Sequence, residues 1–257
     1  MGELDAFLAL AAELADAAGE AIRPHFRQPI AVTDKPDLSP VTVADRAAEA
    51  AMRRLIIARF PQHGIIGEEY GPERADAEFV WVLDPIDGTK SFISGVPLFG
   101  TLIALAQQGR PILGIIDQPI SCERWVGAAG HPASFNGTPI HCRPCAALAA
   151  ATVFSTSPDM FKGPDAVAHG RVAAAAKLVR FGADCYAYGL LAFGFIDLVI
   201  EASLKPYDFS AMVPIVEGAG GIATDWQGKP LTLASDGRVL VAGDRNAHRE
   251  ALALLAA

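Results

Sequence analysis

The order of hydrophobic and polar positions divides the chain into a helical start, a run of strands and a mixed final part. From Leu4 to Phe26, apolar residues recur at steps of three and four, which is typical of one face of an amphipathic helix. Pro24 is expected to end or kink this helix. The same spacing predicts a second helix over residues 43–60, with Thr42 as its N-cap.

Short apolar runs bounded by polar residues predict strands after the second helix. These runs cover residues 64–67, 79–83, 100–107, 111–118 and 123–129. Gln-Gly-Arg at 108–110 predicts a hairpin between two of them. The first part of the chain is therefore expected to form two helices followed by mostly antiparallel strands.

Strands and helices alternate in the remainder of the chain, which favours an α/β layer. Strands are predicted within 151–156, 177–182, 195–201, 220–224 and 239–243, and helices over 165–176, 184–193, 208–218 and 246–256. The fold class is α/β in the broad sense (α+β), with an N-terminal part of residues 1–142 and a C-terminal part of residues 143–257.

Composition narrows the class of protein. Apolar residues make up 51% of the chain and charged residues 19%, which describes a globular protein with a sizeable core. The net charge of -8 argues against nucleic acid as a partner. The N-terminus is too acidic for a signal peptide, and no apolar run is long enough to span a bilayer. We expect a cytoplasmic protein that binds neither nucleic acid nor membrane.

Three further motifs are weak. Cys142 and Cys145 form a single C-x-x-C in a loop, which we attribute to chance, with metal binding or redox chemistry as the alternative. "GTKS" at 88–91 lacks the spacing of a P-loop. "GAGGIA" at 218–223 matches a dinucleotide-binding pattern, but it is predicted to run from a helix into a strand, the reverse of the required order.

Carboxylates follow two of the predicted strands. Asp84 and Asp87 come directly after residues 79–83, and Glu68 and Glu69 follow residues 64–67. Taken alone, Asp84 and Asp87 are also consistent with an Asp-Gly turn. If the two strands are neighbours, however, three or four carboxylates meet at one edge of the sheet.

Such a cluster requires cations. Two unit charges 4 Å apart repel by ~1 kcal/mol in water and ~4 kcal/mol at an effective dielectric constant of 20. Lys90 and Lys35 are the only lysines close in sequence. A divalent ion is the simpler solution, and an all-oxygen ligand set favours Mg²⁺, with Mn²⁺ and Ca²⁺ as alternatives. Residues 88–91 predict a short helix whose first amides would face an anion, so the sequence indicates a phosphate site.

Three motifs resemble those of the inositol-monophosphatase-like, metal-dependent phosphatases. They are "GEE" at 67–69, "DPIDGT" at 84–89 and "YDFSAMVPIVEGAGG" at 207–221, in the family's order along most of the chain. The resemblance implies a layered α-β-α-β-α sandwich of the inositol monophosphatase/fructose-1,6-bisphosphatase type. It also implies a homodimer and hydrolysis of a small phosphomonoester by metal-activated water.

The resemblance implies a role for each matching position. The implied ligands of two or three Mg²⁺ ions are Glu68, Asp84, the carbonyl of Ile86, Asp87 and Asp208. Gly88 and Thr89 are the implied phosphate-binding residues, and Glu68, Thr89, Asp87 and Asp45 form the implied catalytic group. Asp45 matches an outer or supporting aspartate, and a charge at a helix N-terminus is its alternative. The roles of Lys35, Glu69 and Lys90 stay open.

Two acids later in the chain are candidates for substrate selection. Asp184 stands where sugar-type members of the family usually have a small residue, and together with Glu201 it suggests a cationic leaving group. The alternatives are a helix N-cap for Asp184 and a surface charge for Glu201. "LKPYDF" and "GIIDQPISCERWVG" resemble the histidinol-phosphatase branch, which acts in histidine biosynthesis. An inositol or other sugar monophosphatase, and an inactive ligand-binding fold, are the alternatives.

Overall fold

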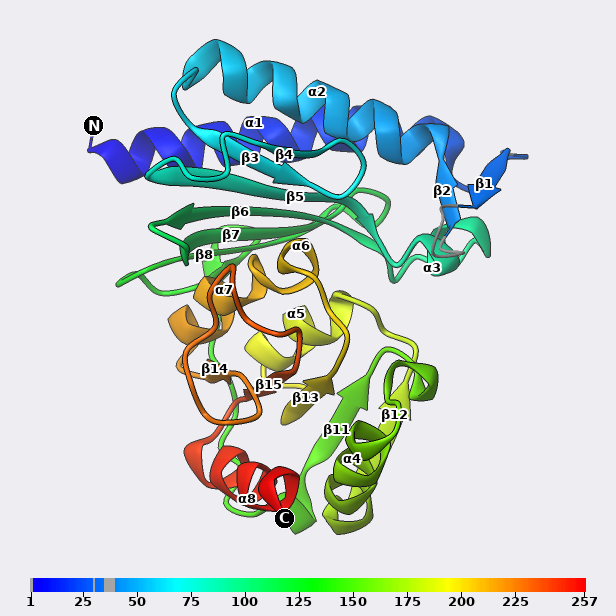
Figure 1. The fold of residues 1–257 in the computed structure, drawn as a ribbon, viewed down its shortest axis with the longest axis vertical. Coiled ribbons are helices and arrows are strands. Elements are labelled where there is room, and N and C mark those ends of the chain that lie inside the picture. The colour runs from blue at the N-terminus through cyan, green and yellow to red at the C-terminus, as the bar shows by residue number, and fades with distance from the viewer. Residues whose placement is uncertain (1, 30, 35–39) are drawn as a thin grey trace.

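A computed structural model describes residues 2–29, 31–34 and 40–257, and the elements stack in five layers (Figure 1). Two long helices form the first layer, an eight-stranded sheet the second, short helices the third, a five-stranded sheet the fourth, and two helices the fifth. The predicted α-β-α-β-α sandwich is confirmed.

The first layer consists of α1 (Glu3–Ile22) and α2 (Val43–Arg59). The predicted apolar face of α1 is buried through Phe7, Leu14 and Ile22, and a short 3-10 helix, η1 (Arg23–His25), contains Pro24 and ends the element. Thr42 caps α2, as predicted, by accepting a hydrogen bond from the amide of Ala44. The helices cover one face of the first sheet because they bury its apolar side chains.

The first sheet has the order β10-β9-β8-β7-β6-β5-β3-β4. Its strands are β3 (Gly64–Gly67), β4 (Gly71–Glu73), β5 (Phe79–Asp87), β6 (Gly100–Gln107), β7 (Arg110–Gln118), β8 (Glu123–Ala128), β9 (Ser134–Phe135) and β10 (Thr138–Pro139). Only the pair β3 and β5 is parallel within this sheet, and α3 (Thr89–Ile93) follows β5. A separate hairpin of β1 (Val32–Asp34) and β2 (Pro40–Thr42) was not predicted.

The second sheet has the order β12-β11-β13-β15-β14. Its strands are β11 (Thr152–Ser155), β12 (Leu178–Phe181), β13 (Leu198–Glu201), β14 (Ile222–Thr224) and β15 (Val239–Ala242). Between the sheets lie α5 (Tyr186–Ala192), α6 (Pro206–Phe209) and α7 (Met212–Gly218), and α4 (Pro164–Ala175) and α8 (Arg245–Ala256) cover the outer face (Figure 1). Two 3-10 turns, η2 (Leu148–Ala150) and η3 (Pro158–Met160), flank β11.

Two predicted helices differ from those observed. The helix expected at residue 184 begins at Tyr186, because Asp184 adopts a left-handed backbone conformation. The helix expected over residues 208–218 is two short helices, α6 and α7. Pro214 has no amide to donate to the carbonyl of Ser210, so one continuous hydrogen-bond ladder cannot form.

One core cluster joins the two sheets through the middle helices. It includes Val82 and Leu102 of the first sheet and Val199 and Val241 of the second. The division between residues 142 and 143 stays a prediction, since this core spans both parts. Among the described residues, no helix is both long enough and apolar enough to cross a membrane.

Candidate active site

The end of β5 carries Asp84 and Asp87 on one side of the sheet because the strand is irregular there. Asp84 pairs with Leu102 and Asp87 with Gly100, so β5 has one residue more than β6 across this interval. Residues three apart on a regular strand face opposite sides of the sheet. The extra residue in this strand therefore brings Asp84 and Asp87 to the same side. The amide of Ile86 donates to Asp84 Oδ1 at 3.1 Å and fixes the carboxylate within the bulge.

Gly88 turns the chain from β5 into α3. Its φ of +82° lies in the region that favours glycine, and a Cβ at this position would lie 2.8 Å from Cγ of Asp184. Thr89, the first residue of α3, donates its hydroxyl to the carbonyl of Ile86 at 3.1 Å. The first-turn amides of a helix have no partner within the helix.

The structure brings together acids that are far apart in the sequence. One carboxylate oxygen each of Asp84, Asp87 and Asp208 lies within 4.8 Å of the others. Asp208, on α6, is held by the Lys205 amide at 2.7 Å. Glu68 directly follows β3, and it both hydrogen-bonds to Asp84 and repels it electrostatically. The predicted convergence of the two strand ends is therefore confirmed.

Burial and mutual repulsion make these carboxyl groups harder to ionise. Burial raises the pKa of Asp84 well above its usual value, and the charges of Glu68, Asp87 and Asp208 add to the effect. The pKa of Asp87 is also raised well above its usual value, first by burial and then by Asp184 and Asp208. Burial raises the pKa of Asp208 to about 7.

The donor set fits a hard divalent cation. Within the described part of the chain, Asp84, Asp87 and Asp208 form no ion pair with lysine or arginine. Asp45 Oδ1 is buried and has no hydrogen-bond partner, and the charge of Glu68 acts on this carboxyl group. Oxygen donors that repel one another and lack a protein cation are the arrangement that Mg²⁺ completes.

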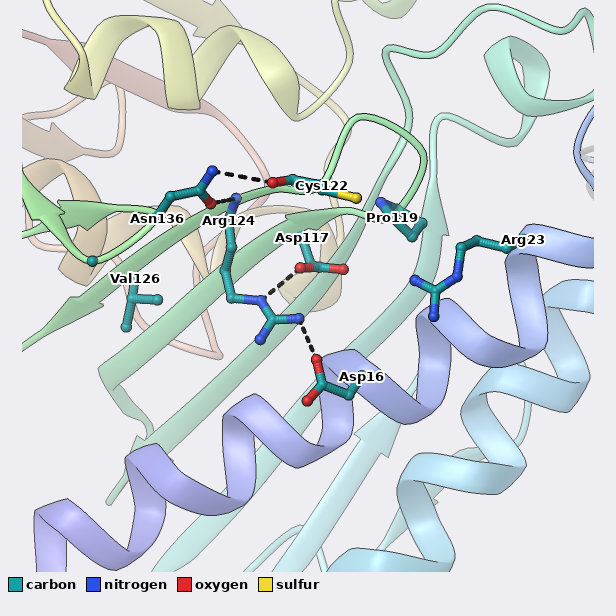
Figure 2. Close-up of a pocket in the computed structure, with 9 residues that line it drawn as sticks. Asp16, Arg23, Asp117, Pro119, Cys122, Arg124, Val126 and Asn136 are labelled. Atoms are coloured by element: carbon teal, nitrogen blue, oxygen red, sulfur yellow. Dashed lines mark hydrogen bonds and ion pairs between the residues drawn. The ribbon is translucent and has the colours of Figure 1, made fainter.

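Another pocket, of about 410 Å³, illustrates the opposite arrangement (Figure 2). There the guanidinium of Arg124 lies between Asp117 Oδ1 at 2.6 Å and Asp16 Oδ1 at 2.8 Å, and Arg23 lines the same pocket. These carboxylates are neutralised by protein side chains. The comparison identifies the Asp84 cluster, rather than this pocket, as the metal-binding candidate.

A cavity of about 370 Å³ opens beside the acidic cluster. It is lined by Glu68, Asp87, Gly88, Thr89, Lys90, Thr156, Met160, Asp184, Cys185, Tyr188, Glu201, Ser203, Leu204, Asp208 and Met212. All of the predicted phosphate-binding and substrate-selecting positions are in this set. Lys90 is exposed at its rim, whereas Lys35 lies outside the described residues.

Asp184 is not a helix N-cap, and Glu201 is not a surface charge. Asp184 does not cap α5; its carboxylate accepts a hydrogen bond from Ser91, and its φ of +44° is uncommon for a residue other than glycine. Directly after it, the amide of Cys185 donates to Asp87 Oδ2 at 2.7 Å. Glu201 is not a surface charge, because it is 3% exposed and accepts bonds from the Thr156 amide and the Tyr188 hydroxyl.

Helix α2 supports the turn that carries Glu68. Asp45 has its expected helix-start role, since its Oδ2 accepts bonds from the amide and hydroxyl of Thr42. Burial raises the pKa of Asp45, and the charge of Glu68 contributes to this shift. One turn further on, Glu49 is fully buried and accepts hydrogen bonds from the amides of Glu69 and Tyr70 at 2.7 and 3.2 Å.

The role of Glu49 was not predicted from the sequence. The available signal was its spacing of four residues from Asp45, which places both acids on one face of α2. Arg53 Nε lies 2.7 Å from Glu49 Oε1 and balances its charge. Glu49 is therefore a structural support for the Glu68–Glu69 turn, and no role of Glu69 itself follows from this contact.

The layered fold and this centre define the class of phosphatases with a carboxylate-rich metal site. The chain belongs to the inositol monophosphatase family, whose sequence pattern matches residues 3–257. The solved structure of an inositol monophosphatase from Zymomonas mobilis is 49% identical, covers 100% of both chains and superimposes with a TM-score of 0.92.

Two curated relatives carry more specific names. A bifunctional phosphatase IMPL2, chloroplastic, of Arabidopsis thaliana is 51% identical over 259 residues, which cover 97% of this chain and 75% of the relative. A histidinol-phosphatase of Chlorobaculum parvum is 38% identical over 252 residues, with 96% of each chain covered. The protein is therefore a phosphatase of this family.

Proposed function

We propose that the protein hydrolyses histidinol phosphate to histidinol and phosphate with the aid of Mg²⁺. The observation that carries the proposal is the cavity in which two acids, the half-buried Asp184 and the buried Glu201, lie beside the acidic cluster. Histidinol phosphate bears an ammonium and an imidazole on its leaving group. A pocket with two carboxylates favours a cationic leaving group over a neutral polyol.

The residues that would hold two or three Mg²⁺ ions are Glu68, Asp84, the carbonyl of Ile86, Asp87 and Asp208. When bound, Mg²⁺ would supply Lewis acidity and lower the pKa of a water molecule. Glu68 and the Thr89 hydroxyl would orient the attacking water toward phosphorus, and Asp45, whose pKa the charge of Glu68 helps to raise, completes the proposed catalytic group.

The chain then carries out an in-line displacement. Water oxygen bonds to phosphorus as the ester P–O bond breaks; the attacking water releases one proton to solvent, and the leaving alkoxide takes up one proton from solvent. The amides of Gly88 and Thr89 hold the phosphoryl oxygens, where negative charge develops. Asp184 and Glu201 bind the cationic end of the leaving group and so orient it.

The relatives support more than one substrate. The histidinol-phosphatase of Chlorobaculum parvum favours the proposal, and the inositol monophosphatase of Zymomonas mobilis favours inositol 1-phosphate or another sugar monophosphate. Asp184 is the observation that favours the cationic substrate. An inactive ligand-binding fold is the alternative outside enzymes, and it is disfavoured because Asp84, Asp87 and Asp208 lie together in the structure. We also propose a homodimer that acts in the cytoplasm.

A panel of phosphomonoesters with and without Mg²⁺ tests the proposal. Phosphate release from histidinol phosphate should exceed that from inositol 1-phosphate under saturating Mg²⁺, and EDTA should abolish both. Equal or reversed rates would reject the substrate. Activity that survives EDTA would reject the metal site. Light scattering in solution measures the oligomeric state.

A further inference from the structure

Tyr188 is a buried polar residue that the mechanism above does not use. It lies on α5, is 1% exposed, and lines the cavity together with Glu201. Its hydroxyl donates to Glu201 Oε2 at 2.7 Å. Its ring packs in the core between the two sheets. The hydroxyl is therefore the one polar group of a side chain that otherwise serves packing.

Glu201 is held by two donors from different elements. The amide of Thr156, just beyond β11, donates to Oε1 at 2.8 Å, and Tyr188 on α5 donates to Oε2. Because β11 and β13 are parallel neighbours, the Thr156 amide lies beside the end of β13 by register. Two donors on two oxygens fix the plane of the carboxylate, and each oxygen keeps a lone pair for a ligand in the cavity.

The geometry points to Tyr188 as the positioning residue that sets specificity for a cationic leaving group by holding Glu201. No ion pair with lysine or arginine compensates Glu201 in the part of the chain that is described. Burial raises the pKa of Glu201, and the hydrogen bonds from Thr156 and Tyr188 oppose that rise because they favour the charged form. Burial, followed by the charge of Glu201, raises the pKa of Tyr188 well above its usual value, so the hydroxyl remains a donor.

This inference rests on the proposed function, in which Glu201 binds the cationic end of the substrate. Tyr188 acts through Glu201 and not on the phosphate, which the acidic cluster and α3 face. Loss of the hydroxyl should therefore weaken binding of a cationic substrate and leave the chemical step intact.

Tyr186 supplies a matched control on the same helix. Its hydroxyl also donates to a glutamate, Glu123, at 2.9 and 3.0 Å, but Tyr186 does not line the cavity. Tyr188→Phe and Tyr186→Phe therefore make the same atomic change at matched bonds. Only the first bond involves an acid that faces the substrate.

The experiment measures KM and kcat for histidinol phosphate and for inositol 1-phosphate in Mg²⁺. Tyr188→Phe should raise KM for histidinol phosphate about tenfold, with kcat and the KM for inositol 1-phosphate within about twofold. Tyr186→Phe should change neither substrate by more than about twofold. In a Glu201→Gln background, Tyr188→Phe should add little, because the bond to a charged acceptor is already lost.

The outcomes separate this inference from the proposed function. If the wild type prefers histidinol phosphate and Tyr188→Phe keeps that preference, the role of Tyr188 is rejected and the substrate stands. A loss of kcat that is equal for both substrates also rejects it. If the wild type has no such preference, the proposed substrate and the specificity role of Tyr188 are both rejected. Where the preference is present, coupling between Tyr188 and Glu201 in the KM for histidinol phosphate would support the inference, and additivity would overturn it.

Discussion

Replacing Asp84 with asparagine should abolish turnover and at the same time stabilise the metal-free protein. The substitution keeps Oδ1, which accepts the Ile86 amide, and removes a negative charge from the acidic cluster. Without that charge Mg²⁺ binds poorly, so we expect activity to fall by at least about a hundredfold. The same loss of charge relieves repulsion that the folded, metal-free chain must otherwise tolerate.

The size of the stabilisation follows from the separation of the charges. For two carboxylate oxygens within 4.8 Å, Coulomb's law gives about 0.9 kcal/mol in water and about 3.5 kcal/mol at an effective dielectric constant of 20. Partial protonation reduces the repulsion, since burial raises the pKa of Asp84. We therefore expect a gain of about 1–2 kcal/mol, or a Tm higher by about 2–8 °C.

Asp117→Asn is the matched control, because it makes the same change at a buried carboxylate that has a cation. Asp117 is 5% exposed and binds Arg124 at 2.6 Å (Figure 2). Removing its charge leaves the half-buried guanidinium with fewer partners, so Tm should fall by a comparable amount.

The assay is thermal unfolding in EDTA at about pH 8, above the pKa of about 7 of Asp208, together with phosphate release in Mg²⁺. The two substitutions should shift Tm in opposite directions. If Asp84→Asn lowers Tm in EDTA as Asp117→Asn does, the cluster is not a centre of uncompensated charge. Turnover at the wild-type rate would remove Asp84 from the metal site.

Three more changes test other parts of the site. In EDTA, Tm should fall as pH rises from about 4 to about 8. Folding raises the pKa of Asp208 from 3.8 to about 7, so between these values the folded state keeps a proton that the unfolded state loses. A Tm that rises with pH would contradict this. Asp184→Ala should raise KM for a cationic substrate about fivefold and spare a neutral one, whereas equal effects would assign Asp184 to local structure. Glu49→Gln should destabilise the protein by about 2 kcal/mol and raise the Mg²⁺ concentration needed for half-maximal rate. The reason is that the amides of Glu69 and Tyr70 lose a charged acceptor. An unchanged Mg²⁺ requirement would show that Glu49 contributes to stability alone.

Much of the fold was accessible from local patterns. The long helices were predicted because their apolar spacing extends over many turns. Thr42 at the start of α2 and Pro24 at the end of α1 were recognised because capping and the missing proline amide act within a single helical turn. The hairpin of β1 and β2 was missed because strands of three residues leave almost no period to detect. The break between α6 and α7 was missed although Pro214 signals it.

The candidate site was less accessible, because the sequence gives residue types but not distances. Asp84 and Asp87 were found through the motif, and their shared side depends on a bulge that no local pattern announced. Glu49 and Tyr188 were missed for one reason. A single acid or tyrosine on an apolar helix face is usually interpreted as a packing residue, and only the folded structure places its oxygen atoms against a loop amide or a second acid.

The acids of the metal-binding cluster are synthesised at different times. Asp84 and Asp87 leave the ribosome with the first sheet, whereas Asp208 follows much later, on a helix that packs between the two sheets. Early parts of a chain begin to fold before later parts exist. A nascent chain that has completed only its first sheet therefore lacks one of the three clustered carboxylates. The acidic cluster is therefore complete only when the middle helices have docked between the two sheets.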